Sequence, residues 1–405
     1  MATTSFLYYC LGLQGYTHLR TEYRNGATYH HVALKHEGRR CAECGARSWH
    51  LTLEGSFERE FNALPVGNRR QFLVLHGHRQ ACRECGALRR EPVGFAKGRC
   101  RHMKTFARYV VGLCGLMALS DVARLLGIGW DRAKQIFKDH LSLRLRRRRT
   151  AHVRRIGVDE FAVSKGHRYM TVVVDLDSGE ILHAHEGKDA AALVPFLLRL
   201  KRSRAPIEAV AMDLSASYIK AVRSVWGNRV AIVHDRYHVV ALANKAVDDT
   251  RRDLVRFLGD SEAAALKRTR FLWLKGAENL EAEALDRLVT RLARFEPLFT
   301  AWSLKETLRD FWEMPDRDIG ALFLDAWTAT ARRMGNVYVK RLADTLDAHR
   351  DGLLAYFEHP ITNASVEGIN NKIKVLKRQA YGFRDNEFFK LRLYFLHEAK
   401  LTLAG

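Results

Sequence analysis

The sequence predicts an α/β protein in which a mixed sheet is preceded by a cysteine-containing segment and followed by a long helical segment. Three observations support this prediction. Apolar, β-branched runs alternate with amphipathic stretches from 156 to 257. The helical pattern then continues without a strand through 250–350. Near the N-terminus, two Cys-x-x-Cys pairs flank a β-like run with a turn at 66–68.

The composition limits the class of protein. The chain has 405 residues, 47% of them hydrophobic, which suits several packed domains and excludes a disordered tail. No apolar run is long enough to span a membrane, and no basic stretch precedes the apolar N-terminus as in a signal peptide. The formal charge is +22, and residues 1–150, with 27 Lys+Arg and 11 Asp+Glu, carry +16 of it. This imbalance favours nucleic acid, ahead of an anionic membrane surface, as the partner.

Four of the seven cysteines form two pairs, Cys41 with Cys44 and Cys82 with Cys85. A glycine follows each pair, in CAECG and CRECG, and permits a tight turn. Four thiolates suit a tetrahedral, structural zinc ion and leave no open position for catalysis. The gap between the pairs is longer than usual, so unligated or redox-active cysteines are the alternative.

Helical periodicity begins near residue 102, and Ser120 or Asp121 is predicted to cap the short helix DVARLLG. The turn GIG and the helix WDRAKQIFKDHL follow, which resembles a helix-turn-helix. A helical pair that merely packs on the core is the alternative. We expect DNA contacts early in the second helix and in the basic linker beyond it, at Trp130, Arg132, Lys134, Arg146, Arg147, Arg148 and Arg149.

From residue 156 the pattern predicts a strand (RIGVDEFAV), a hairpin turning at 177–179, and then helix, strand, helix, strand and a long helix. The order βββαβαβα is that of a ribonuclease H-like core. The segment 250–350 is interpreted as an all-α insertion. Its tryptophans fit core packing better than a stacking platform, and they are Trp273, Trp302, Trp312 and Trp327.

Two predicted strands of this core end in a carboxylate, Asp159 in IGVDEFA and Asp213 in AVAMDLS. Such strand ends face the crevice where ligands bind, and two carboxylates there repel unless a cation lies between them. A third carboxylate, Glu367, would complete an oxygen-rich magnesium site. Two such ions can stabilise the attacking and leaving oxygens of a displacement at phosphorus. A turn or capping role is the alternative for each aspartate taken alone.

Neighbouring polar side chains are alternative candidates for the metal ligands or could assist the proposed ones. Glu160 should point to the opposite face of its strand from Asp159, and Asp175 lies at the hairpin turn. In HDRYHVV, Asp235 and His238 lie three apart on one helical face, where they could brace the metals or contact the scissile phosphate. Simple helix capping by Asp235 is the alternative.

The stretch NASVEGINNKIKVLKRQAYGF, 363–383, predicts a helix capped by Thr362 or Asn363. Its apolar stripe, which should pack on the sheet, is Val366, Ile369, Ile373 and Leu376. Another stripe orders an acid, amides and cations along one side, which a merely solvated face does not explain. Besides Glu367, the residues expected to contact DNA are Asn370, Asn371, Lys374, Lys377 and Arg378.

Taken together, these motifs resemble bacterial insertion-sequence transposases of the ISL-three family. The segments IGVDEFA, VAMDLSASYIKAV, IVHDRYHVV and NASVEGINNKIKVLKRQAYGFRD occur in the order of that family. The cysteine pairs and the helix pair match its N-terminal segments. The resemblance covers nearly the whole chain, and the first 30 residues match less clearly.

The resemblance implies a DDE transposase whose ribonuclease H-like core is interrupted before its last acid. The implied triad is Asp159, Asp213 and Glu367, with two magnesium (or manganese) ions. Implied substrates are double-stranded terminal inverted repeats and target DNA, which undergo strand cleavage and then strand transfer. A homodimer or higher oligomer on paired ends is implied too, in the cytoplasm of a bacterium and associated with its nucleoid.

Five parts are expected: 1–95 (zinc-binding recognition), 96–150 (helix-turn-helix and basic linker), 151–250 (first part of the catalytic core), 251–355 (all-α insertion) and 356–405 (last core helices, with Glu367). Two other functions stay open. One is a domesticated, transposase-derived DNA-binding regulator without catalysis, which has no need for a complete triad. The other is a structure-selective nuclease of the same fold, which has no need for the N-terminal recognition segments.

Overall fold

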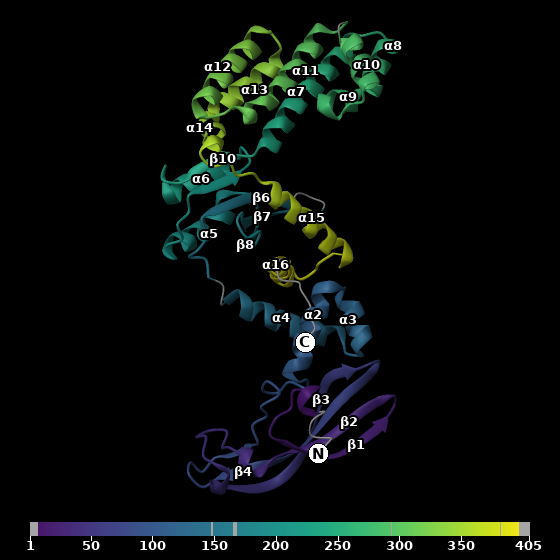
Figure 1. The fold of residues 1–405 in the computed structure, drawn as a ribbon, viewed down its shortest axis with the longest axis vertical. Coiled ribbons are helices and arrows are strands. Elements are labelled where there is room, and N and C mark those ends of the chain that lie inside the picture. Colours follow the sequence, from purple (N-terminus) through teal and green to yellow (C-terminus); the bar gives the residue numbers. More distant parts are fainter. Residues whose placement is uncertain (1–6, 147–148, 165–167, 293, 381, 397–405) are drawn as a thin grey trace. The chain divides into compact units, whose positions relative to one another are not determined.

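The computed structural model describes residues 7–146, 149–164, 168–292, 294–380 and 382–396 (Figure 1). By its internal contacts the chain forms two compact units, Met1–Arg147 with Leu376–Gly405, and Arg148–Val375. The five-part division expected from the sequence stays a prediction. None of the described helices has both the length and the apolar character needed to cross a lipid bilayer.

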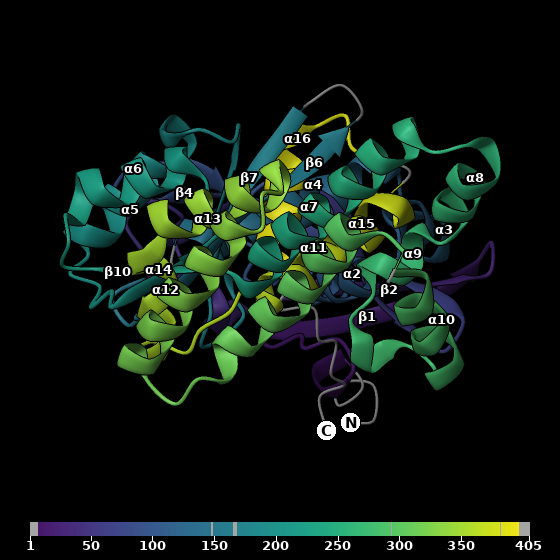
Figure 2. The same cartoon turned by 90° about the horizontal axis from the view of Figure 1, so that it is seen from above.

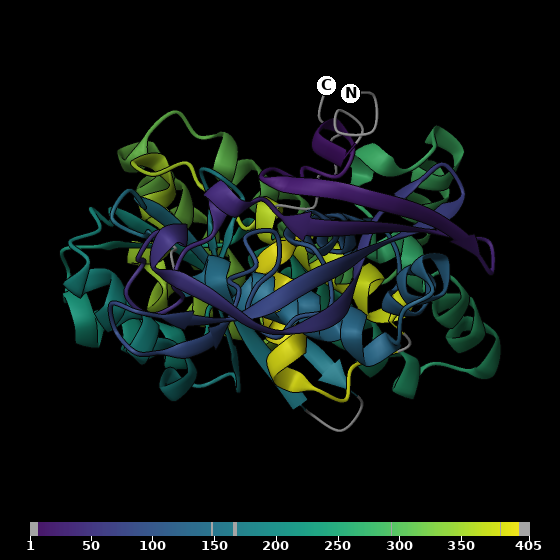
Figure 3. The ribbon, with the colours of Figure 1, turned by 90° about the horizontal axis from the view of Figure 1, so that it is seen from below.

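The first unit begins with a five-stranded sheet, whose long strands Figure 3 shows in purple and dark blue. The strand order is β1-β2-β4-β3, with β5 paired to β4, and only the β2–β4 pair is parallel. The predicted turn joins β3 to β4, where Gly67 has a φ of 56° that glycine adopts without strain. The strands are β1 (Tyr16–Arg24), β2 (Ala27–Leu34), β3 (Leu51–Val66), β4 (Arg69–Cys82) and β5 (Leu88–Arg90), with 3-10 turns η1 (His36–Gly38) and η2 (Ser48–His50).

Helices of this unit that pack beside the sheet-bearing segment in the chain are α2 (Lys104–Leu116), α3 (Leu119–Leu126), α4 (Trp130–Arg146) and α16 (Asn386–Phe395). The predicted cap at Ser120 or Asp121 is wrong. Helix α3 begins earlier, after Ala118, which offers no side-chain cap, so both polar residues lie inside its first turn. Gly127 ends α3 in the left-handed region, with φ 61°. Helix α4 continues through the start of the expected linker, and Arg147 and Arg148 lie outside the described residues.

The second unit is built on a five-stranded mixed sheet of order β10-β9-β6-β7-β8. The pairs β6–β7 and β7–β8 are antiparallel, whereas β9 pairs in parallel with β6 and β10 in parallel with β9. The elements follow the predicted order βββαβαβα. They are β6 (Arg155–Ser164), β7 (Arg168–Asp175), β8 (Ile181–Glu186), α5 (Ala190–Arg202), β9 (Ala209–Met212), α6 (Ala216–Trp226), β10 (Ala231–His234) and α7 (Arg236–Phe257).

Only helices and 3-10 turns occur among the described residues between β10 and α15, and they lie side by side (Figures 1 and 2). Helix α7 packs against α11 and α13, and α12 packs against α13. The tryptophans of this segment are at most 9% exposed, which confirms that they belong to its core. After α7 come α8 (Asp260–Arg268), α9 (Arg270–Leu274), η3 (Ala277–Asn279), α10 (Ala282–Leu292), α11 (Glu296–Leu308), η4 (Arg309–Glu313), α12 (Arg317–Arg333), α13 (Val337–Ala348), α14 (Arg350–Leu354) and η5 (Ala355–Phe357).

Helix α15 (Ala364–Gln379) returns the chain to β6, and its predicted apolar stripe is buried. Gly157 on β6 permits the approach, because a Cβ there would lie 2.6 Å from Val366 Cγ2. The predicted side-chain cap by Asn363 is not made. Its Nδ2 instead donates to the carbonyl oxygen of Val158 at 3.3 Å, and its buried Oδ1 has no hydrogen-bond partner.

Candidate active site

A cleft of about 620 Å³ lies beside β6 at Asp159. The predicted end of this strand at Asp159 is wrong, because β6 runs from Arg155 to Ser164 and Asp159 pairs with Val172 of β7 in its middle. Asp159, Asp235, His238 and Glu367 line the cleft. Residues of the helical segment line it as well, namely Leu274, Gly276, Asn279, Lys305 and Arg309. The first and last carboxylates of the predicted triad therefore border the same cavity, although the helical segment separates them in the sequence.

Both oxygens of the Asp159 carboxylate are held by hydrogen bonds. The backbone N–H of Glu160 donates to Oδ1 at 2.8 Å, and Asn370 Nδ2 donates to Oδ2 at 2.7 Å. Burial raises the pKa of Asp159, and the carboxylates of Asp213 and Asp235 raise it further. The side chain is thus fixed in orientation while its negative charge is poorly solvated, which is a favourable setting for a cation.

Asp159 and Glu160 have different partners, although both line the cleft. Asp159 meets α15, whereas Glu160 interacts with Tyr218 of α6, and burial raises the pKa of Glu160. Asp213 follows β9, where its Oδ1 accepts the backbone N–H of Ser215 at 3.0 Å. Asp175 is held in the hairpin turn by Asp177 N and Ser178 Oγ. Asp175 is therefore a turn residue.

Asp235 links two elements at the cleft. Its Oδ2 lies 3.1 Å from His238 Nδ1, and its Oδ1 accepts the backbone N–H of Asn363 at 3.4 Å. Its side chain makes no capping bond to α7, so the simple capping alternative is wrong. The hydrogen bond to Asp235 raises the pKa of His238, and Asp159 and Asp213 raise it as well. The carboxylates around His238 therefore favour its protonated form.

The two predicted metal sites differ in how closely their ligand atoms are grouped. Among the described residues, only the four paired cysteines form a group of three or more metal-ligating side chains with ligand atoms within 4.8 Å of one another. Asp159, Asp213 and Glu367 do not form such a group, as expected for like charges on separate elements. Their assignment as a triad stays a prediction.

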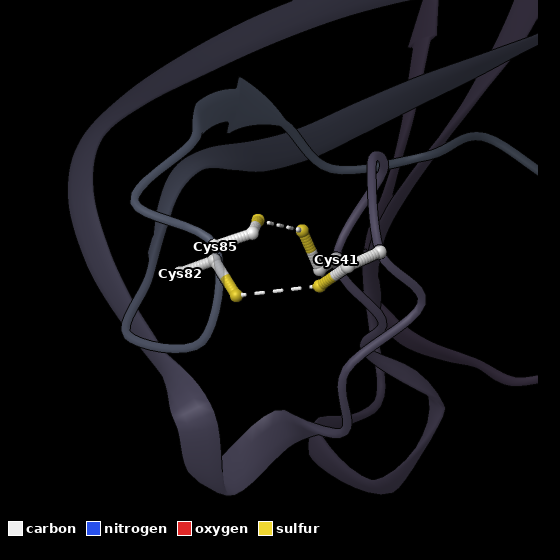
Figure 4. Close-up of side chains that lie close together, drawn as sticks. Cys41, Cys82 and Cys85 are labelled. Carbon is white, nitrogen blue, oxygen red and sulfur yellow. Dashed lines mark hydrogen bonds between the residues drawn. The ribbon is translucent and has the colours of Figure 1, made fainter.

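The four cysteine thiols lie together at one end of the first sheet (Figure 4). Two sulfur pairs, Cys41–Cys85 and Cys44–Cys82, are each 3.7 Å apart. A tetrahedral zinc ion with Zn–S bonds of about 2.3 Å requires sulfur–sulfur edges of about 3.8 Å. Backbone N–H groups of Cys44 and Glu43 lower the pKa of Cys41. The cluster therefore has the geometry of a zinc finger.

The two cysteine loops share one backbone geometry. Cys41 N donates to Ala46 O at 2.8 Å, and Cys82 N donates to Ala87 O at 3.0 Å. The glycine after each pair has a positive φ, 76° in the first loop and 71° in the second. The duplicated CxECG pattern therefore predicted the turns correctly, because glycine adopts this conformation without a Cβ penalty.

The predicted DNA-contacting residues lie in different surroundings. Trp130 and Arg132 are exposed at the start of α4, and Arg146 and Arg149 are exposed as well. Lys134 instead forms an ion pair with Asp385 at 2.8 Å. On α15, Lys374 Nζ donates to Asn371 Oδ1 at 3.3 Å, and burial lowers the pKa of Lys377. Arg378 is exposed, and Asn370 is directed to Asp159.

Comparison with protein families decides the class to which this geometry belongs. A family model described as a transposase matches residues 156–393, which include every carboxylate of the cleft. A second model, described as the helix-turn-helix domain of transposase family ISL3, matches residues 91–141. The chain belongs to the ISL3 transposase family. The predicted family and helix-turn-helix of this ISL3-family chain are thereby confirmed.

Curated relatives extend the match over most of the ISL3-family chain. The transposase for insertion sequence element IS1001 from Bordetella parapertussis is 31% identical over 360 residues, 87% of each chain. The transposase for insertion sequence element IS1557 from Mycobacterium tuberculosis is 30% identical over 397 residues, 91% of this chain and 86% of its own. Among solved structures, the Drosophila P element transposase strand transfer complex is 11% identical, with a TM-score of 0.39, and covers 72% of this chain and 91% of its own.

Two features of the cleft were not predicted from the sequence of this ISL3-family chain. One is the hydrogen bond from Asn370 to Asp159, because the residue pattern of a helical stripe does not indicate which distant residue the stripe contacts. The other is the wall formed by the helical segment, where Lys305 is 2% exposed and donates to the carbonyl oxygens of Trp273 and Lys275. A lysine within an amphipathic helix carries no sequence signal for either burial or a site.

Proposed function

We propose that this chain is a DNA transposase that binds transposon-end inverted repeats and catalyses metal-dependent strand cleavage followed by strand transfer. Family membership supports the class of protein. The observation that carries the catalytic part is the 2.7 Å hydrogen bond from Asn370 to Asp159. It joins the helix that bears Glu367 to the strand that bears Asp159, at a cleft which both carboxylates line.

The catalytic core is proposed to be ribonuclease H-like, with Asp159 within β6 and Asp213 directly after the adjacent strand β9. The order β10-β9-β6-β7-β8, with three antiparallel strands and two strands parallel to β6, supports this assignment. Residues 251–355 would be an all-α insertion between the second and third acids. Residues 1–95 and 96–150 would form the parts that recognise the ends.

Asp159, Asp213 and Glu367 would hold two magnesium (or manganese) ions. The donor atoms are all oxygens, which such ions prefer. Beside Asp159, the buried Oδ1 of Asn370 has no hydrogen-bond partner, so a polar acceptor is left available at the same place. When bound, the ions neutralise phosphate charge and activate the attacking and leaving oxygens. The four cysteines would hold structural zinc, which matches their sulfur spacing.

The protein's own part is to bind and orient the DNA. Asn370 and the Glu160 N–H fix both oxygens of Asp159, so its direction does not depend on the substrate. His238, oriented by Asp235, would donate a hydrogen bond to an oxygen of the scissile phosphate. Lys374, exposed on the same helix as Glu367, would hold the neighbouring backbone.

A cleavage assay tests the proposal. Purified full-length protein with magnesium and labelled terminal repeats should nick or excise them and then join them to target DNA. Glu367→Gln should bind the ends but not cleave them. Cleavage at the normal rate by this variant would refute the triad. End binding without cleavage by the unaltered protein would instead favour a domesticated regulator, and cleavage without preference for repeats would favour a nuclease.

The proposed function also includes an oligomeric assembly and a cellular location. A homodimer or larger assembly would hold two ends together, acting on the bacterial nucleoid in the cytoplasm. Cross-linking of the protein on paired-end DNA would detect such an assembly, and a monomer on paired ends would contradict it.

A further inference from the structure

Helix α4, the second helix of the helix-turn-helix, has two of its three faces occupied within the first unit. One face is apolar and packs on α2 and α3, with Ala133, Ile136 and Phe137 buried. The second face carries Lys134 and Lys138 and meets α16. Which side chains of α4 are accessible to DNA therefore depends on whether α16 stays packed against this second face.

The contact between α4 and α16 has an aromatic centre and a charged rim. The ring of Phe137 lies 6.1 Å from that of Phe388 and 5.1 Å from that of Phe395, both edge-on. At the rim, Asp385 pairs with Lys134 at 2.8 Å, and Glu387 pairs with Lys138 at 2.6 Å. The hydrogen bond from Lys134 lowers the pKa of Asp385.

Helix α16 belongs to the hydrophobic core of this unit. Phe388, Leu391 and Phe395 are at most 8% exposed and lie in the same buried cluster as Phe137. Arg392 ties α16 to α2 as well, through a 3.0 Å bond to the carbonyl oxygen of Cys114. Burial of such large apolar side chains stabilises the contact far more than partly exposed ion pairs do. Helix α16 therefore stays packed on α4, and Lys134 and Lys138 are paired with Asp385 and Glu387 instead of being left for phosphates.

The third face of α4 is the exposed one. Arg132, Gln135 and Asp139 are three and four residues apart, so they form one stripe, and all three are exposed. Gln135 Nε2 donates one hydrogen to Asp139 Oδ1 at 2.7 Å, which orients the amide. The Oε1 acceptor and the second N–H hydrogen remain for a ligand, and adenine offers the matching donor and acceptor in the major groove.

We infer that this stripe reads the DNA, with Gln135 recognising an adenine edge in the major groove and Arg132 contacting a neighbouring base or phosphate. The inference rests on the proposed recognition of terminal repeats and adds which face of α4 carries it. Lys134, which was expected from the sequence to contact DNA, is instead paired with Asp385 just before α16. Base recognition then comes from α4, while the basic surface elsewhere supplies non-specific attraction.

Selection from a randomised terminal repeat tests the inference with full-length protein. Gln135→Ala should lose discrimination at one A·T pair by about 5- to 150-fold, with an almost unchanged salt dependence of binding. Lys134→Met, the matched variant on the α16 face, should keep both the selected sequence and the salt slope. Thermal unfolding should show that each variant still folds.

Three outcomes would overturn the inference. Unchanged base selection by Gln135→Ala would exclude the exposed stripe as the reader. A salt slope lower by about 1 for Lys134→Met, with weaker binding, would place that lysine on a phosphate. Much tighter binding by Asp385→Asn would mean that α16 masks the DNA-binding face. If the unaltered protein selects no sequence at all, the proposed recognition of terminal repeats fails first, and this inference fails with it.

Discussion

The two predicted metal sites of the molecule differ in how far the polypeptide prepares them. In the first sheet, four thiols converge with sulfur pairs 3.7 Å apart, close to the edge of a zinc tetrahedron. In the cleft of the second unit, Asp159 and Glu367 border one cavity, but among the described residues its acids do not form a metal-ligating group of three. Both sites were predicted from ligand types, yet only one has its ligands gathered.

The difference has a physical cause. Each cysteine pair lies in one short loop, where a positive-φ glycine and a backbone hydrogen bond fix the backbone that carries both thiols. The proposed acids come from β6, the end of β9 and α15, and bringing three anions together costs free energy until a cation joins them. The protein fixes Asp159 through hydrogen bonds instead. One site is therefore built by local turns and the other by docking of distant elements.

Metal removal should show the largest contrast. Chelation, or Cys82→Ser, should unfold the first sheet, because a structural zinc site contributes about 10–16 kcal/mol of apparent binding free energy. Metal analysis should find about one zinc per chain, and circular dichroism should report the loss of strand structure. Cys10→Ser, a cysteine outside the cluster, is the control. A zinc content below about 0.5 per chain would rule out the site.

The next largest effect is expected at the carboxylates. Glu367→Gln should lower the cleavage rate on the order of 10³-fold, the upper range for loss of one preorganised electrostatic contact. Folding should hardly change, because Glu367 is exposed. Single-turnover cleavage and thermal unfolding measure the two effects separately. A large loss of stability with intact cleavage would contradict this prediction, because Glu367 would then have a structural role, as the cysteines do.

Loss of the Asn370 amide should have a smaller effect on the same site. Asn370→Ala removes the bond that orients Asp159 and should reduce metal affinity or cleavage by about 10- to 100-fold, as for other groups that orient a ligand. A magnesium titration of the cleavage rate measures this loss. Asn371→Ala, next along α15 and bonded to Lys374, is the matched control. Equal losses in the two variants would show that Asn370 has no special role.

The smallest effect is a pH dependence at His238. Its folded pKa is raised, so the pair with Asp235 stabilises the fold fully below the unfolded pKa of about 6.5 and loses this contribution as pH rises through the folded value. The contribution should be below about 1 kcal/mol, because the imidazole is partly exposed. Urea unfolding without magnesium at several pH values, compared with His238→Gln, measures it. A difference between the proteins that grows with pH would contradict the predicted sign.

Local pattern was sufficient for much of the fold. Alternating hydrophobicity predicted the order of strands and helices, because the backbone period of each element is visible in the sequence. The start of α3 could not be predicted, since Ala118 offers no side-chain cap and polar Ser120 and Asp121 suggested a later start. Capping by Asn363 also failed, because its amide is engaged by β6 instead. In both cases tertiary context outweighed a local preference.

The sequence by itself determined the ligand types of both proposed metal sites, the helix-turn-helix and the apolar face of α15. These depend on residue chemistry and spacing, which the chain carries wherever it folds. Only the tertiary structure decided that Asn370 meets Asp159, that Lys305 and Arg309 wall the cleft, and that α16 covers the lysines of α4. Each of these joins residues far apart in the chain, and such pairs are selected by packing of whole elements, which no local pattern encodes.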